Sequence, residues 1–171
     1  MRRKGLPTIE PLAQAGPVSE MPAWITRRRE APNLLIGSCM CGSVAYEVDA
    51  PAGPIVHCHC RTCRKAHGSA FSSISAVPRE HFRWTRGEEL LAGFESSPGK
   101  LRRFCTRCGS HILAERAGQP TVMLRLGCLD TSLSERPRAH IWRSDGASWF
   151  DPKDVLPELP EGFGTARGPD R

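Results

Sequence analysis

The sequence predicts a small, mostly β fold with short helical turns, and three observations support this fold class. Short segments that alternate polar and apolar residues recur from residue 34 onward, as they do in half-buried strands. Turns that contain glycine or proline separate these segments at short intervals. Of the 171 residues, 39% are hydrophobic, which is enough for one modest core.

The elements are expected in the following order. Residues 43–48, SVAYEV, alternate in the manner of a strand. Residues 61–68, RTCRKAHG, predict a short helix that Gly68 ends, and residues 78–82, PREHF, predict a helical turn. Residues 89–105 predict two strands joined at Ser97-Pro98-Gly99. Further strands are expected at residues 111–116 (HILAER), 121–130 (TVMLRLGCLD), 139–142 (AHIW) and 148–150 (SWF).

The ends of the chain differ in composition from its centre. We expect a basic, proline-containing extension over residues 1–33, one domain over residues 34–160 and a tail over residues 161–171. The opening residues contain no apolar run of signal-peptide length, and no segment approaches the roughly eighteen apolar residues of a membrane span. We therefore expect a cytoplasmic protein with reduced thiols and no membrane partner. The sequence makes no prediction of oligomeric state.

The cysteines are spaced as in metal sites. Seven of the eight form C-x-C, C-x-C-x-x-C and C-x-x-C clusters, and thiols two or three residues apart can bind one ion from a tight turn. Gly42 and Gly109 directly follow the second cysteine of the first and third clusters, where a residue without Cβ lets the backbone turn. In a reducing compartment this pattern favours zinc over disulfides. The clusters are Cys39 and Cys41, then Cys58, Cys60 and Cys63, then Cys105 and Cys108.

The number of ligands separates a structural site from a reactive one. The first and third clusters are far apart in sequence and together supply four thiolates, the closed set of structural zinc. The middle cluster supplies three, which leaves a fourth position for water or an incoming ligand, as in catalytic zinc.

Two alternatives would close the middle site. Cys128 could be a fourth thiolate, although its parity with Leu124 and Leu126 favours the buried face of a strand. A nearby histidine could also bind, although a hydrogen-bonding or exposed position is the simpler interpretation for each; these residues are His57, His59 and His67.

Four segments carry a resemblance to a known family. They are GSCMCGSVAYEV, HCHCRTCRKAHGSAF, RRFCTRCGSHI and HIWRSDGASWFDPKDVLPELP, within about residues 34–160. In order and spacing they resemble the glutathione-dependent formaldehyde-activating enzyme family, which shares its domain with centromere protein V. The resemblance implies a β-tent zinc-binding fold with two zinc ions. It implies a structural ion at Cys39, Cys41, Cys105 and Cys108, and a catalytic ion at Cys58, Cys60 and Cys63.

The resemblance also implies an activity. It is a carbon–sulfur lyase-type reaction that adds a small thiol, such as glutathione, to formaldehyde or a related small aldehyde. An open zinc site can lower the pKa of a bound thiol or polarise the aldehyde oxygen, and the sequence leaves both mechanisms open. Beside the cluster, Arg61, Arg64 and Lys65 are candidate partners for the two carboxylates of glutathione, with a solvated helix face as the alternative.

Two other classes of function are alternatives to this one. A zinc-stabilised module that binds protein or nucleic acid would use the basic residues of the first thirty, which carry half of the net charge of +6. Seven thiolates with two zinc ions cancel the other half, so a nucleic-acid partner is not expected. A redox protein that uses Cys105 and Cys108 lacks the expected βαβ pattern around the pair.

Overall fold

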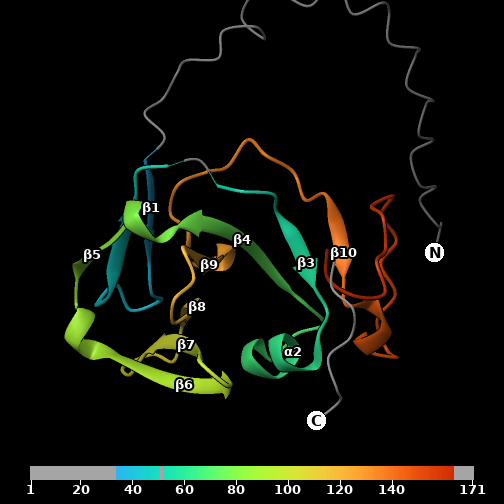
Figure 1. The fold of residues 1–171 in the computed structure, drawn as a ribbon, viewed down its shortest axis with the longest axis horizontal. Helices are drawn as coiled ribbons and strands as arrows, with labels where there is room; N and C mark the ends of the chain where they lie inside the picture. The colour runs from blue at the N-terminus through green and yellow to red at the C-terminus, as the bar shows by residue number, and fades with distance from the viewer. Residues whose placement is uncertain (1–33, 51, 164–171) are drawn as a thin grey trace, which may run out of the picture. The chain divides into compact units, whose positions relative to one another are not determined.

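The computed structural model describes residues 34–50 and 52–163. The predicted N-terminal extension, residues 1–33, and the last eight residues of the predicted tail lie outside the described residues. The described part is mostly β structure with one α-helix, α2 (Arg61–His67), and short 3₁₀ turns (Figure 1). No helix in this part is both long and apolar enough to cross a membrane. The mostly β fold class predicted from the sequence is confirmed.

Ten strands of the described chain form two sheets. The small sheet has the order β1-β2-β5, with β1 (Leu35–Ser38), β2 (Ala45–Val48) and β5 (Phe82–Arg86). The large sheet has the order β10-β3-β4-β9-β8-β7-β6. In it, β10 pairs with β3 in parallel, and all other neighbours are antiparallel. Its strands are β3 (Val56–Cys58), β4 (Ser72–Pro78), β6 (Leu91–Ser97), β7 (Lys100–Cys105), β8 (His111–Arg116), β9 (Thr121–Arg125) and β10 (Ala139–Ile141).

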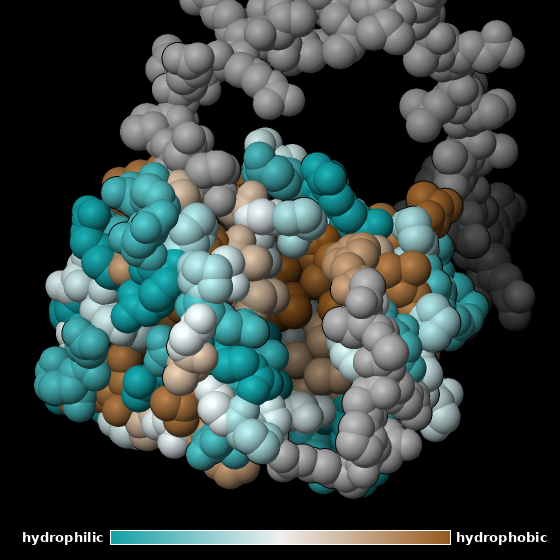
Figure 2. Space-filling view, in the orientation of Figure 1, coloured by the Kyte–Doolittle hydropathy of each residue, from teal (hydrophilic) through white to brown (hydrophobic). Residues whose placement is uncertain are grey.

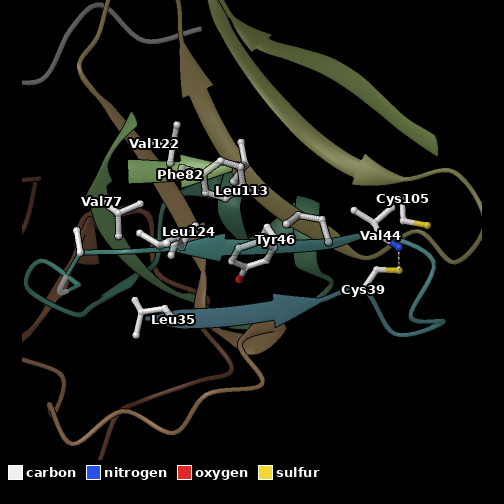
Figure 3. Close-up of a cluster of buried hydrophobic side chains, with 13 residues drawn as sticks. Leu35, Cys39, Val44, Tyr46, Val77, Phe82, Cys105, Leu113, Val122 and Leu124 are labelled. Carbon is white, nitrogen blue, oxygen red and sulfur yellow. Dashed lines mark hydrogen bonds between the residues drawn. The ribbon is translucent and has the colours of Figure 1, made fainter. Parts of the chain in front are cut away.

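The large sheet buries a different cluster of side chains on each face. Leu113 of β8 lies opposite Leu124 of β9, and side chains of one parity share a face. This face packs on the small sheet, where the rings of Tyr46 and Phe82 stack with centroids 5.3 Å apart. The main core includes Leu35, Val44, Tyr46, Val48, Val77, Phe82, Leu113, Val122 and Leu124, with Cys39 and Cys105 at one end (Figure 3).

The second core lies around the helix α2 and brings the middle cysteine cluster into the fold. It contains Val56 of β3, Ile74 of β4 and Ile141 of β10 together with the thiol side chains of Cys58 and Cys63. The apolar surroundings fix the end of β3 and the start of α2 relative to the sheet. Gly68 adopts a left-handed conformation with φ of 56° and ends α2 at the predicted residue.

Most predicted elements are confirmed, and two are wrong. The hairpin at Ser97-Pro98-Gly99, the strand at residues 111–116 and the helix at residues 61–67 are present. Residues 148–150 form no strand, because they lie in a turn where Phe150 N donates to Ala147 O. The strand predicted to run to residue 130 ends at Arg125, which is the last residue of β9 paired with β4. Residues 126–128 form a 3₁₀ turn instead.

Candidate functional site

The first and third cysteine clusters meet in space. The first lies in the turn after β1, and the third begins at the last residue of β7 and continues into the turn that follows. Their four Sγ atoms all lie within 4.8 Å of one another. Gly42 and Gly109 have φ of 69° and 75°, so both turns use the left-handed conformation that favours glycine. The cluster, here called the four-cysteine cluster, consists of Cys39, Cys41, Cys105 and Cys108.

The sulfur separations in this cluster fit a tetrahedral ion. Metal–sulfur bonds of about 2.3 Å place the sulfurs of a tetrahedron about 3.8 Å apart. The Sγ atom of Cys41 lies 3.5 Å from that of Cys39 and 3.9 Å from that of Cys105. Polar groups surround the sulfurs: Val44 N donates to Cys39 Sγ at 3.3 Å, and hydrogen bonds with Ser110 lower the pKa of Cys108 to about 5. The residues can therefore hold one metal ion without rearrangement.

The middle cluster is formed by one continuous segment. Cys58 ends β3, Cys60 is the N-cap of α2, and Cys63 lies in the first turn of the helix. Their Sγ atoms lie within 4.8 Å of one another, and within the described ranges no other cysteine, histidine or carboxylate belongs to this group. Cys63 N donates to Cys60 Sγ at 3.4 Å, so the helix start itself orients one sulfur. This three-cysteine cluster can hold a metal ion with three protein ligands.

The three thiols shift the pKa values of one another. Hydrogen bonds with Cys60 and Cys63, together with burial, raise the pKa of Cys58. Hydrogen bonds with Cys58 and Cys60 lower the pKa of Cys63, and the positive charges of Arg125 and Arg102 lower it further. A metal ion that binds all three thiolates must displace the protons that they carry.

Cys128 does not lie in the three-cysteine cluster. It sits in the 3₁₀ turn after β9, half-buried against the main core, and its Sγ donates to His111 O at 3.3 Å. The predicted position on a strand is wrong, because β9 has no paired partner beyond Arg125.

A chain of hydrogen bonds runs from the segment between Cys58 and Cys60. His59 is completely buried, and its Nδ1 lies 3.4 Å from Arg143 Nη1, a group that only donates. Burial lowers the pKa of His59 to about 4, so the ring is neutral near pH 7 and carries its proton on Nε2. This proton bonds to His140 Nδ1 at 2.8 Å, and His140 Nε2 donates to the Asp154 carboxylate at 3.1 Å. His59 thereby holds the cysteine segment against β10.

The other two histidines near the cluster have different partners. His57 Nδ1 lies 3.0 Å from Ser73 Oγ. His67 lies one helical turn after Cys63, and its ring centroid lies 5.2 Å from that of His111 in β8.

The surface near the three-cysteine cluster is concave. Figure 2 shows a hollow between β3, β4 and α2 in which apolar residues gather.

The three basic residues predicted beside the cluster line one cavity. Its volume is about 400 Å³, and it lies between α2 and the segment after β10. That segment turns sharply because Trp142 adopts a left-handed conformation with φ of 59°. Arg64 Nη1 donates to Asp145 O at 2.5 Å, which fixes one wall. The cavity is lined by Arg61, Arg64, Lys65, Ser144, Asp145 and Gly146.

Two buried arginines beside the three-cysteine cluster were not found by the sequence reasoning. Arg102 in β7 and Arg125 in β9 are each 4% exposed, and Arg102 Nη1 lies 4.0 Å from Cys63 Sγ. The sequence did contain a signal, because each arginine lies inside a predicted strand next to an apolar residue. An arginine in a strand is exposed only if its face of the sheet is open to solvent, and here α2 covers that face.

The fold and the two clusters define a class of small β proteins that can hold one metal ion on four thiolates and another on three. A family model described as glutathione-dependent formaldehyde-activating enzyme matches residues 34–145. The chain therefore belongs to this family, and the resemblance inferred from the sequence is confirmed.

Individual relatives agree with this assignment. A protein from Colletotrichum graminicola named "Putative glutathione-dependent formaldehyde-activating enzyme" is 33% identical over 76% of this chain and 64% of its own length. A protein of the same name from Halomonas elongata is 28% identical over 69% of this chain and 80% of its own length. The chain thus spans slightly less than two thirds of the first relative. A crystal structure of a Rhodobacter sphaeroides protein matches with a TM-score of 0.50 and 24% identity, covering 60% of this chain and 97% of that one, which supports the fold.

Proposed function

We propose that this protein is a zinc-dependent carbon–sulfur lyase-type enzyme that adds glutathione or a similar small thiol to formaldehyde or a related small aldehyde. A bond forms between the thiol sulfur and the carbonyl carbon, and the thiol proton ends on the former carbonyl oxygen. The observation that carries the proposal is the three-cysteine cluster, which has three thiol ligands and no fourth among the described residues. Membership of the family supplies the substrate class.

The donor set of both clusters favours zinc, because soft thiolates in a tetrahedral arrangement select it over magnesium or calcium. When bound to three thiolates, zinc supplies a Lewis acid at its fourth position, where it can lower the pKa of a thiol or polarise a carbonyl. We assign the structural ion to the four-cysteine cluster and the catalytic ion to the three-cysteine cluster. Reduced thiols of this kind fit the predicted cytoplasmic location.

The side chains around the cluster would bind and orient the thiol substrate. Arg61, Arg64 and Lys65 place three positive charges on one cavity beside the cluster, where a carboxylate of glutathione would pair with them. On the other side, the ring centroids of Phe71 and Phe150 lie 5.7 Å apart, and both rings pack on His59. This aromatic wall would exclude water from the segment that carries the ligands.

Replacing one ligand tests the proposal. The change Cys60→Ser should abolish the catalysed formation of S-hydroxymethylglutathione and remove one metal ion, while the ion of the four-cysteine cluster stays bound. Exchange spectroscopy by NMR measures the catalysed rate above the rapid uncatalysed reaction, and elemental analysis counts the ions. The matched control is Cys128→Ser, which also loses one thiol but should keep both ions and full activity. Unchanged turnover in Cys60→Ser would refute the proposal.

A further inference from the structure

We propose that Arg102 and Arg125 form a buried carboxylate-binding site beside the three-cysteine cluster, and that a ligand reacting at this cluster places a carboxylate there. The inference rests on the proposed function for the reacting groups, but the site itself is defined by residues that the proposed function does not use.

The register of the large sheet brings the two arginines to one face. Arg102 of β7 lies opposite Ala114 of β8, which lies opposite Met123 of β9. Arg125 follows Met123 by two residues and therefore points to the same side of the sheet. This is the side that carries α2, because Met123 packs on the second core and Arg102 reaches Cys63.

Unpaired buried nitrogen atoms gather at this place. The Nε atoms of Arg102 and Arg125 are buried and have no hydrogen-bond partner among the described residues. The same holds for His67 Nε2 and His111 Nδ1, whose rings contact each other between α2 and β8. Buried polar groups in folded proteins are almost always paired, so the two arginine Nε–H groups, which can only donate, indicate a missing acceptor. The imidazoles of His67 and His111 lie within the electrostatic reach of both arginines.

The charges around the cluster point to an anionic acceptor. Three thiolates and one divalent ion carry a net charge of −1, whereas Arg102, Arg125 and the nearby Lys100 carry up to +3. Neither arginine forms an ion pair with a carboxylate in the described part of the chain. Burial and the charge of Arg102 lower the pKa of Lys100, as expected for a cation among other cations. The site can therefore accept at least one further negative charge.

A carboxylate fits this arrangement better than a neutral group. Ionised carboxylates only accept hydrogen bonds, and guanidinium groups bind them through paired N–H donors in one plane. The group could belong to the thiol, as in glutathione, or to the aldehyde, as in glyoxylate. Glutathione has two carboxylates, so one can occupy this site while the other pairs with the basic cavity lined by Arg61, Arg64 and Lys65.

A pair of matched thiols tests the site in the native, metal-loaded chain. 3-Mercaptopropionate carries a carboxylate, whereas 2-mercaptoethanol has a hydroxyl in a comparable position. In calorimetric titrations we expect the carboxylate thiol to bind at least about tenfold more tightly, because hydrogen bonds to charged groups are among the strongest in proteins. A second pair, glyoxylate and formaldehyde, is compared in the rate of addition to 2-mercaptoethanol. A preference in either pair shows that a carboxylate is recognised and identifies its source, and the substitutions below decide between this site and the basic cavity. No preference in either pair overturns the site.

Substitution locates the preference. In Arg102→Met the preference should fall to about onefold, whereas Arg103→Met should keep it, because Arg103 is the next residue of β7 and pairs with Glu115 at 2.7 Å on the other face. Arg125→Lys keeps the positive charge and should retain part of the preference, which shows that a substitution at this place does not destroy the fold. A preference that survives unchanged in Arg102→Met would refute the assignment.

Propionate, which has no thiol, separates this inference from the proposed function. If propionate shifts the ring resonances of His67 and His111 in the native chain and not in Arg102→Met, the carboxylate site stands even if no thiol reaches the metal. If thiols bind to the metal without any carboxylate preference, the proposed function stands and the site is refuted.

Discussion

The two cysteine clusters differ in how they are built. The four-cysteine cluster joins two turns more than sixty residues apart, one from each sheet, and polar groups such as Ser110 surround its sulfurs. The three-cysteine cluster comes from six consecutive residues at the end of β3 and the start of α2, and two buried arginines lie beside it. The first cluster therefore connects distant parts of the chain. The second connects only neighbouring residues, and it places three thiols next to two positively charged side chains.

The separation of the ligands along the sequence indicates the role of each site. An ion bound by distant segments stabilises the folded state, because the unfolded chain cannot bring its ligands together. An ion bound by one short segment gains little from folding and can be held with an open position.

The largest effect is expected from breaking the four-cysteine cluster. Cys105 is fully buried at the end of the main core, and Cys105→Ser should lower the free energy of unfolding by more than about 5 kcal/mol or leave the chain unfolded. Cys60→Ser, at the half-buried N-cap of α2, should cost less than about 2 kcal/mol. Urea denaturation of the metal-loaded variants measures both values. Equal losses of stability would contradict the division into structural and catalytic sites.

Much of this comparison could be predicted from the sequence. The spacing of the cysteines identified both clusters, because ligands two or three residues apart are a local pattern. The hairpin of β6 and β7 and the helix α2 could be predicted for the same reason. Turn residues mark the hairpin and a terminal glycine marks the end of the helix, and both signals lie within the segment itself.

The rest depended on contacts between distant segments. Strand β4 was not predicted, because the polar residue Ser75 stands among its buried positions. Ser75 is buried all the same, and its hydroxyl donates to Gly53 O at 2.8 Å. The bond of His59 to His140 joins residues eighty-one positions apart. The place of Arg102 beside Cys63 follows from the register of the sheet, which no single segment encodes.

A second difference between the clusters should appear on acidification. In the three-cysteine cluster, the neighbouring thiols and burial raise the pKa of Cys58 and that of Cys60. In the four-cysteine cluster, burial raises the pKa of Cys105 to about 11, but hydrogen bonds lower that of Cys41 and lower that of Cys108 to about 5. A ligand with a higher pKa takes up its proton at higher pH and then cannot bind a metal ion. The three-cysteine cluster should therefore lose its ion first, at a higher pH than the four-cysteine cluster. Visible spectra of the cobalt-substituted chain report each loss, and Cys60→Ser assigns the bands. Loss from the four-cysteine cluster first would reverse the predicted order.

The smallest effect is expected at the basic cavity. Arg64 is a donor to Asp145 O, and Arg64→Ala should raise KM for glutathione about three- to tenfold, with little change in kcat. KM for 2-mercaptoethanol should stay the same, because this thiol has no carboxylate that Arg64 could bind. Arg83→Ala, on the exposed strand β5, is the matched control and should change neither value. An equal rise of KM for both thiols would mean that Arg64 acts through the shape of the three-cysteine cluster, and the cavity would then have no role in recognising a carboxylate.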